Sequence, residues 1–220
     1  MEIHDPSVHG CTIIILWNPS FRKYTRLPYL ENNHIPSFGF GYDRLTRVHT
    51  MGTNVWRRTQ DPPRFPYSAS GKFVSGSGTL NWFTTQSIIS LDLEKESYRE
   101  LLYPGSDLMA LLRPRITDLC VLRDCLCVVH CHSTFSDVWF MKEYGNNDSW
   151  TKFIRIQADV TSRVLYLYED DQVLLALESS RKLGIYDSRD GTVKTTLVIQ
   201  NNCGYRALEV YQETLMSPVL

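Results

Sequence analysis

A short hairpin pattern recurs along this chain and constrains its fold more than any other feature. In the segment LWNPSFRKYTRLP, residues 16–28, apolar residues lead into Asn18 and Pro19, and Tyr24 follows six positions after Asn18. An Asn at the head of a turn hydrogen-bonds to the backbone two residues on, and Pro presets φ for the next position. An aromatic residue then favours a pleated, half-buried strand. The segment therefore predicts a β-hairpin with a polar corner and an aromatic return.

The same layout appears at further places in the chain. A polar residue stands six positions before an aromatic or β-branched one at Thr50 and Trp56, Asp92 and Tyr98, and Asp187 and Val193. A looser copy, DVWFMKEYGNNDSWTKFIRI, has a longer corner before Trp150. The corners at 18, 50, 92 and 187 are 32, 42 and 95 residues apart. The looser copy divides the last interval into two of roughly 47, which is a propeller-blade spacing. We predict an all-β, β-propeller-like array of small antiparallel sheets, incomplete because the first interval is short.

Between these corners, apolar strands alternate with turn residues, and long amphipathic helices are not expected. The expected elements are a hairpin at 11–28, a glycine-containing strand at 38–42, strand pairs at 71–83 and 88–103, a short helical turn at Leu108–Leu112, three strands at Asp118–Leu122, Leu126–Cys131 and Asp137–Met141, strand pairs at 164–178 and 182–199, and a final strand at 207–217. Residues 1–10 are expected to be a ragged N-terminus, and 11–220 one domain.

Composition and charge exclude several classes of protein. A net charge of −1 gives no basic field for nucleic acid or for an anionic membrane. The N-terminal residues lack the basic start and apolar run of a signal peptide, and no stretch approaches the roughly 18 apolar residues of a membrane helix. We expect a cytoplasmic or nuclear protein with reduced cysteines, no cofactor, and no nucleic-acid or membrane partner.

One cysteine-rich strand offers the only dense set of soft metal ligands. Cys125 and Cys127 alternate in an apolar run, so they share one face of a strand, and Cys131 and His132 follow. Zinc sites need a further ligand pair at a distance. We therefore interpret the thiols as core residues, with a metal or redox role as the alternative. The segment Gly76–Gly78 lacks the Lys-Ser/Thr of a phosphate loop and predicts a turn. We predict no catalytic and no metal-binding residue.

Several segments together resemble the F-box-associated domain of plant F-box/kelch-repeat-type proteins. They are, in the family's order, LWNPSFRKYTRLP, FGFGYD, FVSGSGTLNW, IISLDLEKESYRELLYP, VLRDCLCVV, DVWFMKEYGNNDSWTKFIRI and VYQETLMSP, and the similarity extends from residue 11 to the end. The resemblance implies a β-propeller-like module that captures the protein to be ubiquitylated. It also implies an N-terminal F-box that docks on the Skp-type adaptor of an SCF (Skp–cullin–F-box) ubiquitin ligase.

The sequence departs from that family pattern in two places. Met1 precedes the first motif by only ten residues, which leaves no room for an F-box. Between Asp43 and Val48 only Arg44–Arg47 intervene, where family members have a further strand pair. We therefore expect a truncated product without its F-box and without about one strand pair after Asp43, whose unpaired backbone groups would be exposed. The SCF adaptor is then a partner only if an F-box lies upstream.

These observations favour a protein-binding module that resembles the substrate-recognition domain of an SCF-type receptor and binds an unidentified target protein. Loops on a rigid scaffold supply binding residues. The candidate loops are 29–37, 61–70 and 104–115, and the candidate residues are Tyr29, His34, Arg64, Phe65, Tyr67 and Arg113. The alternative is a non-functional or partly folded truncated product. A propeller hydrolase ranks third, because it needs converging carboxylates and Asp92, Asp118, Asp137 and Asp187 share no register.

Overall fold

Strands dominate the computed structural model of this protein. The structure describes residues 2–4, 12–27, 39, 62–64, 66, 70–84, 86–105, 117–132, 134–157, 162–177, 182–198 and 210. These residues form fifteen β-strands, and the single helical element among them is a short 3-10 turn, η1 (Asn147–Ser149). The all-β prediction is confirmed.

The strands form four separate antiparallel sheets, each assembled in chain order. The first sheet has three strands and the others have four. The bounds are β1 (Glu2–His4), β2 (Thr12–Asn18) and β3 (Lys23–Arg26); β4 (Lys72–Val74), β5 (Thr79–Phe83), β6 (Ile88–Asp92) and β7 (Ser97–Leu101); β8 (Thr117–Leu122), β9 (Cys125–Cys131), β10 (Ser136–Met141) and β11 (Trp150–Ile156); β12 (Ser162–Leu167), β13 (Val173–Leu177), β14 (Lys182–Asp187) and β15 (Thr192–Val198).

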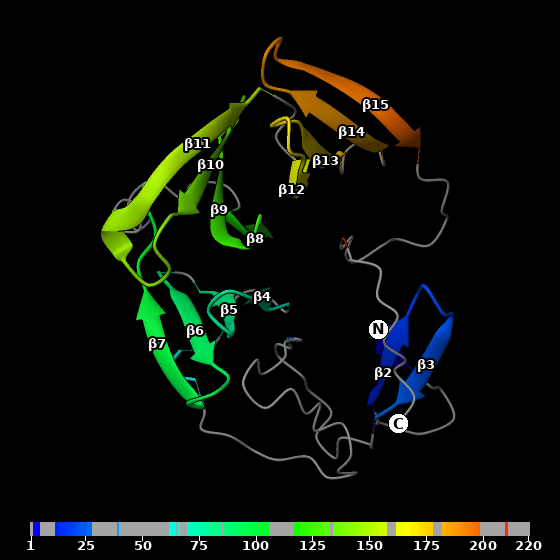
Figure 1. Cartoon of the computed structure of the whole chain (residues 1–220), viewed down its shortest axis with the longest axis vertical. Coiled ribbons are helices and arrows are strands. Elements are labelled where there is room, and N and C mark those ends of the chain that lie inside the picture. Colours follow the sequence, from blue (N-terminus) through cyan, green and yellow to red (C-terminus); the bar gives the residue numbers. More distant parts are fainter. Residues whose placement is uncertain are drawn as a thin grey trace.

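The sheets stand around a common centre, as blades do in a propeller (Figure 1). The first strand of each four-stranded sheet (β4, β8 or β12) lies on the inside, and the last (β7, β11 or β15) lies at the periphery. The predicted propeller-like array of small sheets is confirmed. Three expected features lie outside the described residues, namely the strand at 38–42 apart from Gly39, the helical turn at Leu108–Leu112 and the final strand at 207–217 apart from Val210.

The repeated hairpin of the sequence is the outer pair of strands in each sheet. In β2–β3, β6–β7 and β14–β15, the corner residue pairs with the residue five positions later. The residue before the corner pairs with the aromatic or β-branched position in all three hairpins. The repeat is thus confirmed at the corners Asn18, Asp92 and Asp187, whereas the copy at Thr50 lies outside the described residues.

The corner side chains cap their turns as the sequence predicts. Asn18 Oδ1 accepts hydrogen bonds from the backbone nitrogens of Ser20 (2.9 Å) and Phe21 (3.3 Å). The carboxylates at the other two corners likewise accept a bond from the backbone nitrogen two residues on. The fourth residue after each corner has a left-handed backbone, with φ of 53° at Arg22, 50° at Glu96 and 69° at Gly191.

The residue before a corner is buried only where a neighbouring sheet covers it. In the first hairpin this residue is Trp17, which is 53% exposed beside its cross-strand partner Tyr24 at 55%. In the last hairpin it is Tyr186, which is buried and donates from its hydroxyl to the backbone oxygen of Arg155 in the adjacent sheet (3.1 Å). Packing between sheets, and not the hairpin itself, decides whether this position belongs to the core.

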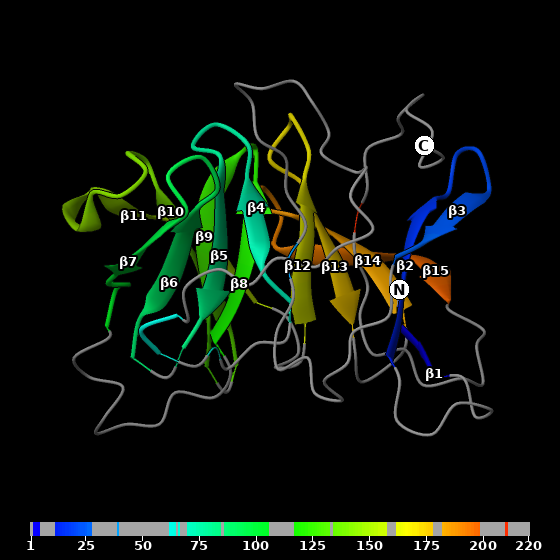
Figure 2. The same ribbon diagram turned by 90° about the horizontal axis from the view of Figure 1, so that it is seen from below.

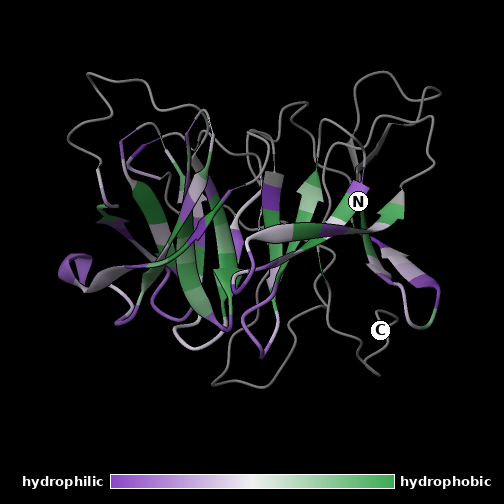
Figure 3. Ribbon diagram, turned by 90° about the horizontal axis from the view of Figure 1, so that it is seen from above, coloured by the Kyte–Doolittle hydropathy of each residue, from purple (hydrophilic) through white to green (hydrophobic). Residues whose placement is uncertain are grey.

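Two apolar cores lie between successive four-stranded sheets. One joins β4–β7 to β8–β11 and contains Leu126 and Val128, and the other joins β8–β11 to β12–β15 and contains Cys127 and Val129. Strand β9 is therefore buried on both faces, which explains its unbroken apolar run. The strands are mainly hydrophobic and the turns that join them are mainly hydrophilic (Figure 3).

Antiparallel pairing sends the connections alternately to two ends of the sheets (Figure 2). We call one the turn end; it carries the hairpin turns 19–22, 75–78, 93–96, 123–124, 142–149, 168–172 and 188–191. The opposite end, the loop end, carries the links between β5 and β6 and between β9 and β10. The strand ends that flank the predicted binding loops 29–37, 61–70 and 104–115 all lie at the loop end.

Candidate protein-binding surface

Arg64 is the one predicted binding residue that the structure describes; Tyr29, His34, Phe65, Tyr67 and Arg113 lie outside the described residues. Its guanidinium bridges two parts of the second sheet at the loop end. Nε lies 3.0 Å from Oε1 of Glu100, and Nη1 donates to Oε1 of Gln86 (3.0 Å). Ser87 also donates its hydroxyl to Glu100. Arg64 therefore ties the predicted loop 61–70 to the end of β7 and to the β5–β6 link.

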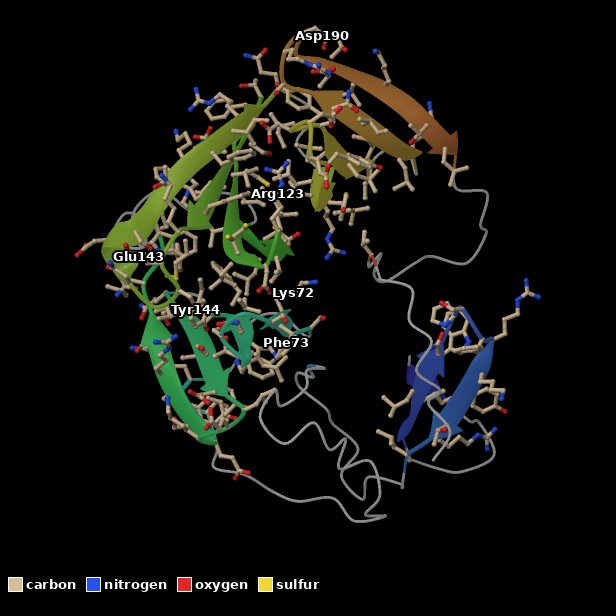
Figure 4. The ribbon with its side chains drawn as sticks, viewed as in Figure 1. Lys72, Phe73, Arg123, Glu143, Tyr144 and Asp190 are labelled. Atoms are coloured by element: carbon tan, nitrogen blue, oxygen red, sulfur yellow. The ribbon has the colours of Figure 1, made fainter. Side chains whose placement is uncertain are left out.

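The turn end, in contrast, holds neighbouring sheets together. Asp124, in the two-residue turn between β8 and β9, accepts hydrogen bonds from the backbone nitrogens of Ser75 (2.7 Å) and Gly76 (2.6 Å). Its neighbour Arg123 donates in the other direction, to the backbone oxygen of Tyr168 and to Asp171 (3.0 Å). One turn thus fastens the third sheet to the second and the fourth, and Figure 4 shows Arg123 between β8–β9 and β12.

A second fastening comes from Tyr144 in the corner between β10 and β11. Its hydroxyl donates to Oδ1 of Asn81 (2.7 Å) and lies 2.6 Å from the hydroxyls of Thr79 and Ser90. These three partners are buried on β5 and β6 of the preceding sheet. The guanidinium of Arg99 covers the tyrosine ring at 4.7 Å. Tyr144 therefore closes a polar network across the sheet boundary (Figure 4).

The corner between β10 and β11 also forms hydrogen bonds with Leu102, the residue that follows β7. Asn147 Oδ1 accepts a hydrogen bond from the backbone nitrogen of Leu102 (3.0 Å), and Trp150 donates from Nε1 to the backbone oxygen of Leu102 (2.8 Å). The motif MKEYGNNDSW, one of the segments on which the family resemblance rests, is therefore an inter-sheet contact. Its residues support the scaffold and do not form a free binding loop.

A charged cluster at the loop end surrounds Asp137, which is nearly buried at the start of β10. Arg155 donates from Nε to Oδ1 (2.7 Å) and from Nη2 to Oδ2 (3.0 Å), and Lys152 donates to Oδ2 (2.8 Å). His132 Nε2 lies 4.0 Å from the same oxygen. Burial raises the pKa of Asp137, but the bonds from Arg155 and Lys152 outweigh burial and lower the pKa to about 2. The carboxylate stays ionised, and the two cations hold it.

Aromatic rings flank this charged cluster. The Phe135 ring stacks on His132 with centroids 4.3 Å apart, and the Arg155 guanidinium lies 3.9 Å from the Phe135 centroid. Lys152 Nζ lies 5.2 Å from the centroid of Trp139. Arginine and lysine over aromatic faces gain electrostatic attraction from the rings. The arrangement leaves a guanidinium and an ammonium exposed beside aromatic rings, where they can contact an anionic or polar group.

Sequence reasoning considered Asp137 only as a hydrolase carboxylate and missed this cluster. A signal was present, since Asp137 is a charged residue at the start of an otherwise apolar strand, and Lys152 and Arg155 lie on the returning strand of the same hairpin. Asp137 and Arg155 are direct cross-strand partners. The sequence does not reveal this pairing, because it depends on the register between β10 and β11, and a long corner leaves that register open.

The other aspartates considered for a hydrolase also have cations of their own. Asp92 pairs with Lys95, Asp118 with Arg163 and Asp187 with Arg189. Hydrogen bonds from Arg189 hold the pKa of Asp187 well below its usual range. A general acid needs a raised pKa, so these pairings work against that alternative.

The cysteine-rich strand packs in the core, as predicted. Cys127 is fully buried, Cys125 packs at the edge of the same core, and burial raises the pKa of both thiols. Within the described parts of the chain, no group of three or more His, Cys, Asp or Glu residues could hold a metal ion. Those parts also contain no helix long and apolar enough to cross a membrane.

Known proteins resemble this chain in sequence and in fold, although no protein-family model matches it. It is 29% identical over 239 residues to an F-box/kelch-repeat protein of Arabidopsis thaliana, covering 93% of this chain and 64% of that protein. It is 28% identical over 185 residues to the F-box protein CPR1 of the same plant, covering 72% and 45%. Virginiamycin B lyase from Staphylococcus aureus superimposes on 88% of the chain and 64% of its own, with a TM-score of 0.52 and 12% identity.

The structural comparison informs the fold, and the sequence comparisons show which known proteins this chain is related to. The lyase is too distant in sequence to indicate more than the fold, which is β-propeller-like. The chain spans 64% or less of the length of the curated relatives described here. Its curated homologues are plant F-box/kelch-repeat proteins, in agreement with the resemblance of its sequence motifs.

Proposed function

We propose that this chain is a protein-binding module, the substrate-recognition part of an SCF-type E3 ubiquitin ligase receptor. The observation that carries the proposal is homology to F-box/kelch-repeat proteins over 93% of the chain, which folds into an array of separate antiparallel sheets. The resemblance of the motifs supplies the role, because the corresponding module of that family captures the protein to be ubiquitylated.

We infer that the target protein binds at the loop end. Two of the described turns at the opposite end, 123–124 and 142–149, are committed to inter-sheet contacts through Asp124 and Tyr144. The predicted loops attach at the loop end, where a rigid scaffold projects variable connections. The candidate residues remain Tyr29, His34, Arg64, Phe65, Tyr67 and Arg113.

Affinity capture with a matched pair of variants tests this proposal. The chain is immobilised and exposed to plant extract, beside a variant with Phe65→Ala and Tyr67→Ala and a control with Phe21→Ala in the turn 19–22. The proposal expects a protein that the parent and the control retain and the loop variant loses. The half-life of that protein in plant cells should change when the chain is overproduced, because the chain either recruits it to a ligase or shields it.

Three outcomes would contradict the proposal. The loop variant could retain the same proteins as the parent. The half-lives of the captured proteins could stay the same when the chain is overproduced. Purified residues 1–220 could also lack a cooperative thermal transition, which would favour the partly folded alternative. We further infer that these residues alone bind the target and not the Skp-type adaptor, so direct recovery of purified adaptor would refute that part.

A further inference from the structure

The surface around Asp137 carries one more positive charge than negative. We define the Asp137 surface as His132, Phe135, Asp137, Lys152 and Arg155. The Asp137 side chain is 6% exposed, whereas Lys152 is 41% and Arg155 is 48% exposed. The cations therefore reach solvent while the anion that fixes them does not.

Asp137 uses only part of the hydrogen-bonding capacity of its two cations. Guanidinium has five N–H donors and ammonium has three. Arg155 directs Nε and Nη2 at the carboxylate, and Lys152 directs its ammonium at Oδ2. The remaining donors, including both on Arg155 Nη1, have no side-chain acceptor among the residues that the structure describes. They can take a second anionic group from outside.

Ring stacking holds these donors in position before any partner arrives. The Phe135 ring stacks on His132 and also lies over the guanidinium of Arg155, and Asp137 binds the edge of that guanidinium through Nε and Nη2. Lys152 rests over Trp139. A guanidinium held in this way loses little conformational freedom on binding.

Two buried nitrogens beside the surface lack partners. Trp139 Nε1 and His130 Nε2 are inaccessible to solvent and form no hydrogen bond. Their rings are neighbours, with centroids 6.3 Å apart, on the adjacent strands β9 and β10. An indole nitrogen is a donor only, so Trp139 needs an acceptor that this part of the chain does not supply.

We propose that the Asp137 surface binds a carboxylate or phosphate group on a peptide segment of the partner protein. One excess charge beside aromatic rings suits a single anionic side chain, whereas nucleic acid presents a series of phosphates to a strongly basic face. This inference rests on the proposed function, because it assigns the chemistry by which the target is recognised. A glutamate, an aspartate, a chain-terminal carboxylate and a phosphorylated residue share that chemistry.

Peptide titration of the whole chain distinguishes these sources. The probes are a fluorescein-labelled glutamate-rich peptide, its glutamine counterpart, and an uncharged peptide with one phosphoserine. Anisotropy measures affinity at low salt and at about 200 mM salt, because screening weakens exposed charge pairs. We expect the glutamate or the phosphoserine peptide, and not the glutamine peptide, to bind, and the affinity to fall with salt.

Lys152→Gln is the diagnostic variant, because it removes the excess charge and leaves the bidentate pair of Asp137 and Arg155 intact. We expect it to weaken binding about tenfold, the loss of one charge-assisted hydrogen bond. Lys194→Gln removes an exposed lysine from a different sheet and should leave affinity unchanged. Fluorine NMR of 5-fluorotryptophan protein, with the resonance assigned through Trp139→Phe, should show Trp139 shifting on peptide addition.

The results that would overturn the inference are specific. Equal binding of the glutamate, phosphoserine and glutamine peptides would do so, as would equal losses in the two lysine variants or tighter binding of a DNA strand of the same length. If Lys152→Gln binds the target as tightly as the parent does, and the Phe65 and Tyr67 variant loses that target, the inference fails and the proposed function stands.

Discussion

The carboxylate of Asp124 receives a hydrogen bond from the backbone nitrogen of Gly76 at 2.6 Å, across the boundary between two sheets. The glycine-rich turn therefore does bind an anion, and the anion belongs to the same chain. The absence of a side chain at 76 makes this possible, because a Cβ there would lie 2.7 Å from Asp124 Oδ2. Neighbouring sheets are therefore held together by hydrogen bonds between turns as well as by the apolar cores.

Gly76→Ala should destabilise the fold by about 1–2 kcal/mol. The added methyl group displaces the Asp124 carboxylate and weakens its bonds to the nitrogens of Ser75 and Gly76. Urea denaturation monitored by tryptophan fluorescence measures the free energy of unfolding. In an Asp124→Ala background the same glycine substitution should cost clearly less, since the clash partner is gone. Full additivity of the two substitutions would show that the contact does not stabilise the protein.

Tyr144→Phe should cost about 1–3 kcal/mol, because it deprives three buried groups of a partner. Asn81 loses the hydrogen that its Oδ1 accepts, and the hydroxyls of Thr79 and Ser90 lose their contact. Thermal and urea unfolding measure the change. Tyr24→Phe is the matched control, since the Tyr24 ring is mainly exposed. Equal stability of the two variants would mean that the Tyr144 network is not a fastening between sheets.

The hairpin repeat could be predicted because its signals are local. A polar corner that bonds the backbone two residues on, and a strand residue six positions later, depend only on neighbours in sequence. A glycine between aromatic residues in a strand also indicates close approach of another chain segment, and a Cβ added at Gly39 would lie 2.9 Å from Leu80 and 3.0 Å from Trp82. Such local features can be recognised in a single sequence without any knowledge of the rest of the fold.

Contacts between sheets could not be predicted in the same way. Asp124 and Gly76, or Tyr144 and Asn81, are far apart along the chain, and their pairing depends on how two separate sheets are placed. The motif around Tyr144 stood out in the sequence, yet nothing in it showed that the side chain serves the scaffold. The Asp137 cluster was missed for a related reason, because the register across a long corner decides which charges meet.

The left-handed residue after each corner gives a third prediction. Gly191 has a φ of 69° and no atom within 4 Å of an added Cβ, so Gly191→Ala tests backbone strain alone. It should destabilise by about 1 kcal/mol. Arg22 occupies the equivalent position with a φ of 53°, and Arg22→Gly should stabilise by a smaller amount, because glycine also gains freedom in the unfolded chain. Opposite signs in the two unfolding experiments support a shared corner geometry, and equal signs contradict it.

Acid should remove the contribution of Asp137 to stability. The folded pKa of about 2 lies below that of an unfolded aspartate, so the unfolded chain takes up its proton first as pH falls. The contribution, on the order of 2 kcal/mol, is complete above about pH 5 and is lost progressively as pH falls through about 2. Urea unfolding at intervals between pH 6 and about 2 measures it as the difference between the protein and Asp137→Asn. That difference should be largest near neutral pH and should shrink in acid. A difference that is constant across the range would show that the carboxylate titrates normally and that Arg155 and Lys152 do not hold it.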